Sequence, residues 1–343
     1  MTRLESEPEV MALAAELGMP AKTDPVRWVV DHCLARVKSW CPSSAPVADI
    51  GELEKLVTRN LQVVLEEAWT DDGLDAIIER YVDMGEGVFR FLRHDLDSGT
   101  FGVTIRRKNA SLDASDRYVA VIDCRGDKAA RRFFTRWHEI AHLLVLTQDL
   151  DSPVRRASDS PLERLMDEIA GQVGFYQPIF DPAFAAYMPD GEPLTFDAVE
   201  KIRKRHFPDA SFQATLFAAM RRSESPTVYL EAALAYKAEE ARAVNRSEQW
   251  LFDDARPAPK LRAAKVVPNA AALASGFFVP PNMRVPESSI IHRLFVATDE
   301  QELSGTENLG SWEHSKGKKL HSRPVWIESR KVRDGVFATI QEQ

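Results

Sequence analysis

Apolar residues recur at helical spacing along much of the chain, with charged and polar residues between them. Segments 8–18, 25–39 and 74–81 show this pattern, and we expect a helix in each. Asp49 stands immediately before another apolar repeat that starts at Ile50, which is typical of a helix N-cap. The first part of the chain is therefore predicted to be rich in amphipathic helices.

Short runs of β-branched and aromatic residues alternate with these helices. They predict strands at Leu61–Leu65, Gly87–Leu92, Phe101–Arg106 and Tyr118–Cys124. We expect these strands to form a small mixed sheet.

The remainder of the chain changes in character at the proline-rich stretch Arg256–Lys260, which is a candidate domain boundary. Before it, helical spacing predicts helices at Thr195–Arg205, Ser211–Arg221 and Ser225–Ala243. After it, a helix near 269–275 and short strands are predicted, with the strands at Lys265–Val267, Phe277–Val279, Ile290–Ala297, Val325–Glu328 and Val336–Ile340. The last part is thus expected to be a compact β-rich domain.

Composition limits the possible classes of protein. With 343 residues, 44% of them hydrophobic, the chain is long enough for two domains with separate cores. The N-terminus is too polar for a signal peptide, and no apolar run is long enough to cross a membrane. The three cysteines are scattered and form no disulfide framework, so we expect a cytoplasmic protein.

The candidate chemistry lies in His138-Glu139-Ile140-Ala141-His142. Residues four apart share one face of a helix, so His138 and His142 can direct two imidazoles at one metal ion. Glu139 lies beside them, where it can take a proton from a metal-bound water. Imidazole suits zinc, and a catalytic zinc keeps one position open for water. A solvated helix that happens to carry two histidines is the plainer alternative.

A catalytic zinc of this type needs a third protein ligand, and the next predicted helix offers three acids. That helix begins at Ser160, a good N-cap, and carries Glu163, Asp167 and Glu168. The pattern slightly favours Glu168, because Gly171 nearby lets two helices approach closely. An ion pair between Glu168 and Arg164 is the structural alternative.

The stretch Phe133–His142 resembles the signature of the ImmA/IrrE metallopeptidases, and Glu168–Pro178 resembles the second helix of that family. The resemblance covers roughly residues 45–180, although the Asn and the Leu-Leu-Met-Pro end usual in the second helix are absent. It implies a minimal zincin in which Zn²⁺ is held by His138, His142 and Glu168. It also implies an α+β fold, with a small mixed sheet, the active helix and a second ligand helix.

Combined with the boundaries above, the resemblance predicts four segments. They are N-terminal helices at 1–45, a zincin-like core at 46–190, a helical segment at 191–255 and a β-rich sensor domain at 256–343. Similar regulators are bacterial proteases of DNA-damage or anti-phage responses that cleave a helix-turn-helix repressor. Such a repressor is therefore the expected substrate of this chain.

Cys124 ends a predicted strand only 14 residues before His138. A thiolate is a strong zinc ligand, so Cys124 could block the open position reversibly; a buried structural cysteine is the alternative. A donor for the oxyanion is also needed, and Tyr176, Tyr187 and His206 stay open as candidates.

The chain has a net charge of −8, which argues against a general nucleic-acid binder. The last quarter nevertheless carries more basic than acidic residues, and aromatic residues accompany Lys316, Lys318 and Lys319. Such a mixture suits single-stranded DNA, by phosphate attraction and base stacking, although the aromatics could equally belong to a core.

Three functional hypotheses follow. The first is a zinc endopeptidase whose C-terminal domain senses an activator such as single-stranded DNA. The second is a nucleic-acid-binding regulator that uses the zincin fold for signalling without proteolysis. The third is a structural metal site, which would need Cys124 as a fourth ligand. Glu139 favours the first, because a scaffold without catalysis has no need of a carboxylate there.

Overall fold

The computed structural model describes residues 4–42, 46–97, 99–110, 115–146, 160–189, 191–245, 258–313, 317 and 319–343. The chain divides into two compact units, and each is described by itself. Unit 1 consists of Met1–Tyr187 and Glu200–Ala218, and unit 2 of Met188–Val199 and Ala219–Gln343. Helices and two sheets make up these units, so the predicted α+β class is confirmed.

Unit 1 begins with helices, two of which start at aspartate caps. After the short 3-10 helix η1 (Leu4–Ser6) come α1 (Pro8–Glu16), α2 (Pro25–Trp40) and α3 (Ile50–Leu61). Asp24 accepts a hydrogen bond from the backbone of Arg27, and Asp49 accepts one from the backbone of Glu52. Each side chain satisfies an amide that the helix leaves unpaired, which is why the predicted starts are confirmed.

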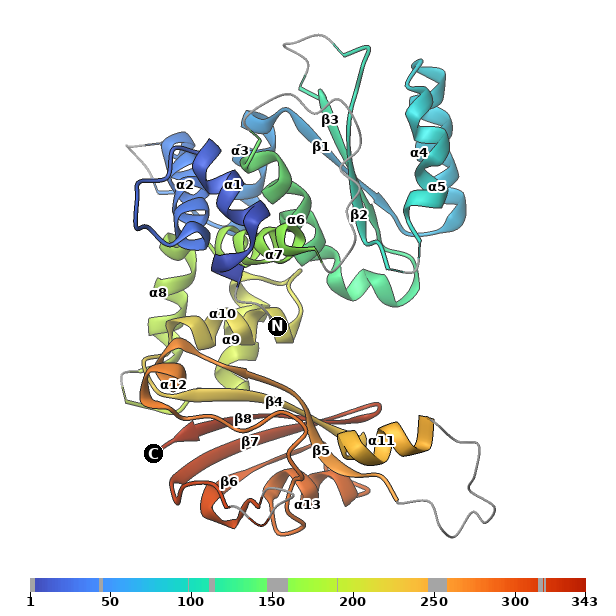
Figure 1. Cartoon of the computed structure of the whole chain (residues 1–343). Coiled ribbons are helices and arrows are strands. Elements are labelled where there is room, and N and C mark those ends of the chain that lie inside the picture. The colour runs from blue at the N-terminus through green and yellow to red at the C-terminus, as the bar shows by residue number, and fades with distance from the viewer. Residues whose placement is uncertain are drawn as a thin grey trace. The chain divides into compact units, whose positions relative to one another are not determined.

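A three-stranded mixed sheet lies at the centre of unit 1 (Figure 1). Its strands are β1 (Val63–Ala68), β2 (Gly102–Arg106) and β3 (Tyr118–Asp123), in the order β1-β3-β2. β1 runs parallel to β3, whereas β2 runs antiparallel to it. Every residue of β3 is buried, as expected of a central strand with both faces covered. The small mixed sheet that the strand pattern predicted is confirmed.

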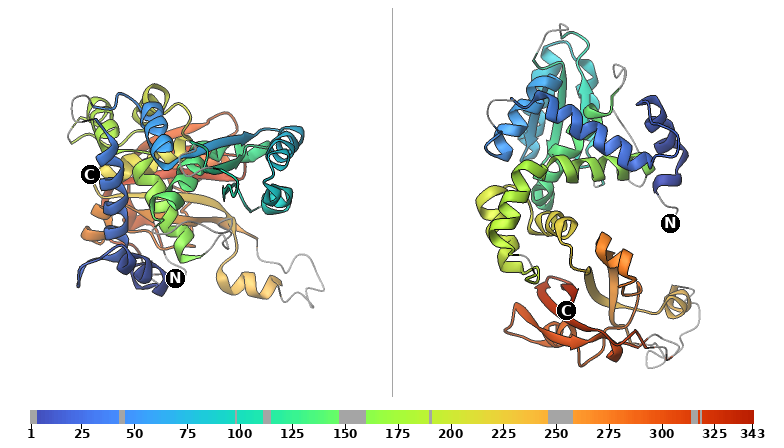
Figure 2. Two further views of the ribbon diagram at one scale, coloured as in Figure 1. Left: turned by 90° about the horizontal axis from the view of Figure 1, so that it is seen from above. Right: turned by 90° about the vertical axis from the view of Figure 1, so that its left-hand side faces the viewer.

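Helices cover both faces of this sheet (Figures 1 and 2). One face packs against α4 (Asp71–Asp83), η2 (Gly87–Phe91) and α5 (Leu92–Asp95), around a core that includes Leu74, Phe89, Leu92, Val103, Ile105, Val119 and Val121. The opposite face carries Thr104, which contacts α6 (Arg132–Leu144). A short 3-10 helix, η3 (Gly126–Arg131), leads into α6. The sheet therefore presents an edge strand, β2, to the helix that carries the histidine motif.

The strand predicted at Gly87–Leu92 is wrong, because η2 and the start of α5 occupy this segment. Phe89, Leu92 and Leu96 are buried here, at the spacing of a helical face. Val88, one residue away from Phe89, is only half-buried. A short apolar run fits a strand or a helix equally well, and here the tertiary packing selected the helix.

The remaining helices of unit 1 pack through aromatic side chains. α7 (Pro161–Val173) crosses α6, and α8 (Gln177–Tyr187) follows it. The unit boundaries fall inside α9 (Phe196–His206) and α10 (Phe212–Arg222), whose predicted helical character is confirmed. Phe175 lies at the middle of the cluster, with ring centroids 5.4 Å from Phe133 and 5.2 Å from Phe207.

Unit 2 is built on a five-stranded antiparallel sheet. Its strands are β4 (Thr227–Ala235), β5 (Lys260–Pro268), β6 (Glu302–Asn308), β7 (Pro324–Val332) and β8 (Gly335–Glu342), in the order β5-β4-β8-β7-β6. Helices α12 (Ala270–Ser275) and α13 (Ile290–Val296) pack on one face, and α11 (Ala238–Asn245) follows β4. The predicted β-rich character and the helix near 269–275 are confirmed; a 3-10 helix, η5 (Leu309–Ser311), completes the unit.

Two segments of unit 2 differ in secondary structure from the prediction: one predicted helix begins as a strand, and one predicted strand is a helix. The helix predicted at Ser225–Ala243 is wrong over its first half, which forms β4 and pairs with β5 and β8. Val228, Leu230 and Ala232 point into the core with strand alternation. The strand predicted at Ile290–Ala297 is instead α13, which the side chain of Ser289 caps at its start.

One more strand predicted in unit 2 is absent, and one strand that is present was not predicted. Phe277–Val279 lies outside the strands, although Phe277 and Val279 are buried in the core. β6 was missed because Glu302–Asn308 is polar and lies at the edge of the sheet, where no residue of the strand is fully buried. Edge strands pair on one side and face solvent, so their sequences carry little hydrophobic signal.

Leu194 and the first residue of α9, Phe196, pack against the second face of this sheet. Phe196 contacts Phe337 with ring centroids 5.4 Å apart, and its backbone N–H donates to Glu328 Oε2 at 2.8 Å. Leu194 and Gln341 exchange two hydrogen bonds of 2.7 Å. Burial raises the pKa of Glu328 to about 7, a rise that the hydrogen bond from Phe196 partly opposes.

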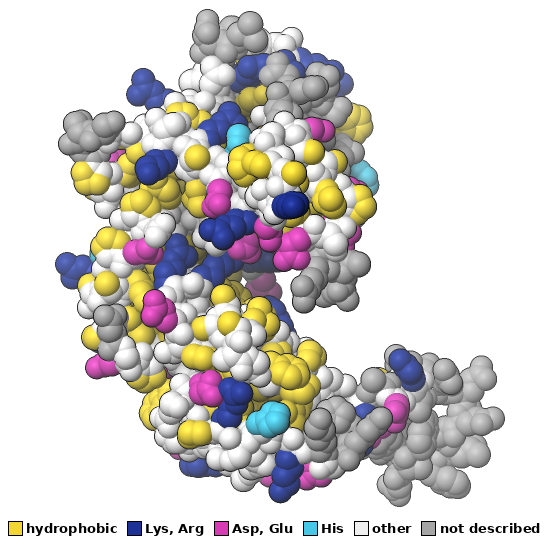
Figure 3. Space-filling model, turned by 60° about the vertical axis from the view of Figure 1, so that its left-hand side comes forward, with side chains coloured by type: hydrophobic (Ala, Val, Ile, Leu, Met, Phe, Trp, Pro, Cys, Tyr) yellow, Lys and Arg dark blue, Asp and Glu magenta, His cyan; other side chains and the backbone are white. Residues whose placement is uncertain are grey.

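The surface shows charges of both signs. On the face drawn in Figure 3, basic and acidic side chains are interspersed over unit 1, and those of unit 2 are scattered among hydrophobic ones. None of the described helices combines the length and apolar character that a bilayer crossing requires.

Glu328→Gln should flatten the pH dependence of stability of unit 2. The folded state favours the protonated Glu328, so its stabilisation is fully present below pH 4.5 and is lost as pH rises through about 7. Calorimetric melting at pH 5 and pH 8 should show a smaller loss in the variant than in the natural chain. Glu300→Gln, at an exposed position, is the matched control; equal losses in all three proteins would contradict the assignment.

Candidate metal centre

Helix α6 brings the two motif histidines together on one face. His138 and His142 are one turn apart, with ring centroids separated by 4.9 Å and Nε2 atoms by 3.2 Å. His142 is buried and His138 is largely covered. Two ring nitrogens this close share a proton in a hydrogen bond, or they direct both lone pairs at one ion.

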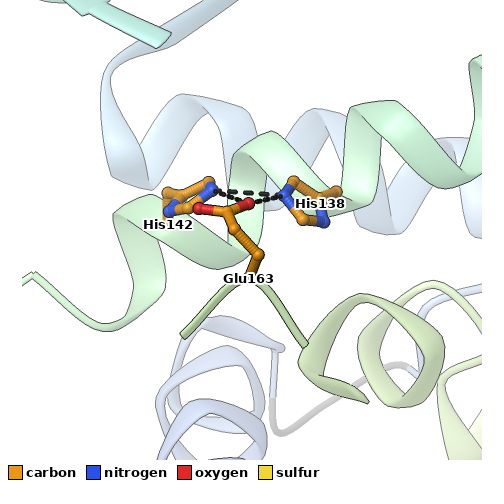
Figure 4. Close-up of side chains that lie close together, drawn as sticks. All are labelled: His138, His142 and Glu163. Atoms are coloured by element: carbon orange, nitrogen blue, oxygen red, sulfur yellow. Dashed lines mark hydrogen bonds and ion pairs between the residues drawn. The ribbon is translucent and has the colours of Figure 1, made fainter. Parts of the chain in front are cut away.

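The first turn of α7 supplies a carboxylate to the same point. Ser160 caps α7 by accepting a hydrogen bond from the backbone of Glu163, and Pro161 occupies the first helical position. This start directs Glu163 toward α6, where its Oε2 lies 2.9 Å from His138 Nε2 and 3.5 Å from His142 Nε2 (Figure 4). The ligand atoms of His138, His142 and Glu163 all lie within 4.8 Å of one another.

These three donors fit a tetrahedral metal ion. Ligand atoms about 2.0–2.1 Å from a tetrahedral Zn²⁺ lie roughly 3.3 Å from each other. The three observed separations are 2.9, 3.2 and 3.5 Å. Two imidazoles and one carboxylate are the donor set of many catalytic zinc sites, and they leave the fourth position of the ion open. The group can therefore hold a metal ion.

A second carboxylate orients His138. Asp167, one turn along α7 from Glu163, lies 2.8 Å from His138 Nδ1. Because a carboxylate accepts, Nδ1 carries a proton, which leaves Nε2 as the ring nitrogen that can bind either an ion or a second proton. This arrangement, ligand imidazole backed by a carboxylate, is common around protein-bound metals.

Electrostatics in the metal-free group reflect the same arrangement. Burial alone would lower the pKa of His138, but hydrogen bonds to Asp167 and Glu163 and the charge of Glu139 outweigh it and raise the pKa to about 10. Burial acts to raise the pKa of Glu163, yet the two histidines hold it well below its usual range. A proton thus compensates the carboxylates where no metal does.

The structure brings Glu163, rather than the favoured Glu168, to the histidines. Glu163 and Asp167 share one face of α7, whereas Glu168 is about 100° further round the helix. Glu168 is half-buried and its Oε1 accepts a hydrogen bond from Gln172 at 3.4 Å. It belongs to no cluster of metal-ligand atoms within the described residues. Spacing alone could not distinguish acids on adjacent faces of one helix, but the Ser160 cap already indicated which residues form the first turn.

The edge strand β2 holds Glu139 in place. Glu139 is only 5% exposed, and its Oε2 accepts a hydrogen bond of 2.6 Å from the buried hydroxyl of Thr104. A Cβ on Gly102 would lie 2.7 Å from Glu139 Oε1, so a residue without a side chain is needed at 102. Sequence reasoning missed both of these β2 residues.

A cavity of about 370 Å³ opens beside this group. His138, Glu139, His142, Glu163 and Asp167 line one side of it. The other lining residues include His94, Asp97, Phe101, Gly102, Arg131 and Phe134. This volume is in the range of ligand pockets, so the histidines are accessible from solvent through a defined cleft.

Cys124 is not part of the group. Its side chain is 2% exposed, and the ligand atoms that converge in the described chain come from His138, His142 and Glu163 alone. Burial, followed by the charge of Glu67, raises the pKa of Cys124 to about 11, which disfavours a thiolate. The described residues therefore offer three metal ligands, as a catalytic site needs, and do not place the thiol that a blocking or fourth ligand would require.

The three candidate oxyanion donors do not line the cavity in the described structure. Tyr176 is buried and its pKa is raised to about 12 by burial. Tyr187 and His206 instead face each other, with ring centroids 6.3 Å apart. His94 and Arg131 are the nitrogen donors that line the cavity besides the motif histidines, and no local pattern in the sequence marked them.

Of the three lysines predicted to contact nucleic acid, the structure describes Lys319. Lys316 and Lys318 lie outside the described residues. Lys319 is exposed and forms an isolated antiparallel bridge with Glu313 in unit 2.

No protein-family model matches the chain, and no curated protein matches it. The resemblance to the ImmA/IrrE peptidases accordingly rests on the motif residues themselves.

Glu163→Ala should weaken Zn²⁺ binding by about 100-fold or more, because it removes a direct ligand. Asp167→Asn should cost about 10-fold, since Asp167 acts through His138. Competition with a chromophoric chelator measures both. Glu168→Ala is the matched control from the same helix and should bind like the natural chain; a larger loss in Glu168→Ala than in Glu163→Ala would reverse the ligand assignment.

Thr104→Val keeps the shape of the side chain but removes the hydroxyl that donates to the buried Glu139 carboxylate. The free energy of unfolding should fall by about 1–3 kcal/mol, because the carboxylate is left without this donor. Thr104→Ser keeps the hydroxyl and should retain most of the stability. Urea unfolding of the two variants compares them directly. Equal stability of both would show that the hydroxyl contributes nothing to holding Glu139.

Proposed function

We propose that this protein is a zinc-dependent endopeptidase with His138, His142 and Glu163 as metal ligands and Glu139 as the general base. The observation that carries the proposal is the convergence of three donor atoms at 2.9–3.5 Å beside a buried glutamate and an open cavity. A structural metal site would have no need of the cavity or of Glu139.

A bound zinc would polarise a peptide carbonyl and lower the pKa of a coordinated water. The residues of the chain have distinct tasks around that chemistry. Thr104 occupies Oε2 of Glu139, so proton transfer falls to Oε1, which lies beside the cavity-lining Gly102. Glu139 would take the proton of the attacking water and pass it to the leaving amine. His94 and Arg131 are the available donors toward negative charge that develops on the carbonyl oxygen.

The position of β2 supports a polypeptide substrate. Within the described residues β2 pairs with β3 on one side, and Gly102 and Val103 also line the cavity. An extended peptide can add to such a strand edge through backbone hydrogen bonds, whatever its side chains. A chain laid along β2 would pass directly beside Glu139.

For the biological role, we propose cleavage of a helix-turn-helix repressor in the cytoplasm during a stress, DNA-damage or anti-phage response. The support is the resemblance of Phe133–His142 to the ImmA/IrrE signature. The β-rich unit 2 would then sense the activating signal, and single-stranded DNA is one candidate.

A nucleic-acid-binding regulator without proteolysis is the second candidate function, favoured by the basic excess near the C-terminus. On the face drawn in Figure 3, however, basic side chains of unit 2 are scattered rather than gathered in a continuous stripe. The buried Glu139 beside the histidines favours the peptidase, because a regulator without proteolysis has no need of that carboxylate.

Glu139→Gln should abolish cleavage while leaving zinc binding within a few-fold of the natural chain, because it removes only the base. Cells that express either protein, with and without DNA damage, can be compared by mass spectrometry of newly formed protein N-termini. New termini should appear with the natural chain alone. Termini that appear equally with Glu139→Gln would refute the mechanism, and their absence in both, with intact binding of single-stranded DNA, would favour the regulator.

A further inference from the structure

A cavity of about 490 Å³ in unit 2 contains a buried arginine that lacks a counter-ion in the described structure. The cavity lies between α11, the start of β5 and two loops. Its lining consists mainly of charged residues: Lys237, Glu240, Lys260, Arg262, Arg284, Glu287 and Glu313, with Pro286 and Ser311. We propose that this cavity binds a small molecule carrying a phosphate or carboxylate group, with Arg262 as the anchor.

Arg262 is the residue that requires a ligand. It lies on β5, paired with Ala233 of β4, and is 3% exposed. Its Nη1 donates to the carbonyl oxygen of Asn282 at 3.0 Å, but its buried Nε has no hydrogen-bond partner among the described residues. No described carboxylate lies within ion-pairing distance of it. An arginine keeps its charge inside a protein, and an unpaired buried charge is costly, so an anion would complete the site.

The other charges of the cavity do not neutralise Arg262. Glu287 pairs with Arg284 at 2.6 Å, and Glu240 accepts a hydrogen bond of 2.9 Å from the backbone of Lys237. Two carboxylates are thereby engaged elsewhere. The ammonium groups of Lys237 and Lys260 have no ion-pair partner among the described residues, and the remaining acid, Glu313, is exposed.

This arrangement selects for a compact oxyanion. The planar guanidinium of arginine binds carboxylate and phosphate through two parallel hydrogen bonds, which a lysine cannot do. Flexible lysines at the rim, such as Lys260, would add long-range attraction. The volume is in the range of pockets that enclose a nucleotide-sized molecule, whereas a polymer could present only a single group to a guanidinium buried this deeply.

Titration calorimetry of the full chain tests the inference with inorganic phosphate, adenosine monophosphate and citrate, each against sodium chloride at equal ionic strength. At least one of the three should bind the natural chain and raise its melting temperature. Arg262→Gln should weaken that binding by tenfold or more. Arg333→Gln, an exposed arginine on the β7–β8 turn, is the matched control and should bind normally.

Stability gives a second readout. If Arg262 is retained for binding, Arg262→Met should melt at the same or a higher temperature than the natural chain without anions, because it removes an uncompensated charge. Lys260→Gln, at the exposed rim, covers the case in which neither Arg262 variant folds; it should weaken binding several-fold.

Three outcomes would overturn the inference: no anion binds beyond the salt control, binding survives Arg262→Gln, or only a single-stranded oligonucleotide binds. None of these measurements needs a bound metal or cleavage, and the Arg262 and Lys260 variants leave the metal ligands unchanged. A failure here is therefore distinct from a failure of the proposed peptidase.

Discussion

Helix α6 carries ionisable side chains on two of its faces inside unit 1, and compensating these charges shapes most of what surrounds it. On the face away from the histidines, Arg136 pairs with Glu54 at 2.9 Å and Glu67 at 3.1 Å. Arg132 joins the same network through Asp209 at 2.5 Å. Burial, together with the nearby acids Asp209 and Glu67, raises the pKa of Glu54. The ion pairs of this network are therefore partly desolvated, and burying their charges costs free energy that the pairing must offset.

Fixing α6 from several sides has a functional consequence. Arg36 of α2 donates to the carbonyl oxygen of Leu144 at 2.9 Å and so caps the C-terminal end of the helix. Thr104 and Gly102 fit against Glu139 from the sheet, and α7 crosses at the histidines. A metal centre requires ligands placed to within about half an ångström, and packing of this kind supplies that precision before any ion binds.

The sequence predicted those features of the site that depend only on residues close together in the chain. The caps at Asp49 and Ser160 were readable because one side chain satisfies one backbone amide, and the histidine pair was readable because helical spacing is fixed. Glu163 could not be separated from Glu168, since which face of α7 turns toward α6 depends on packing between the helices. Gly102 and Thr104 come from a strand 30 to 40 residues before the motif, and only the sheet register brings them to Glu139.

The same reasoning explains why unit 2 was harder to predict. Apolar segments as short as Thr227–Ala235 and Ile290–Val296 fit both the helical and the strand spacing of hydrophobic residues. The elements that they pack against then decide whether each segment forms a helix or a strand. Arg262 is a more extreme case: in the sequence it is one basic residue among many, and its meaning arises only from burial beside β4. In both units the informative residues are buried ionisable groups that packing brings together. In unit 1 a proton on His138 compensates the nearby carboxylates, and the proposed metal ion would take its place between the imidazoles and Glu163. In unit 2 the buried guanidinium of Arg262 has no carboxylate partner among the described residues, so the ligand proposed there must supply the opposite charge. The two proposed sites therefore differ in the charge of the ligand, although both follow from the cost of burying an ionised group.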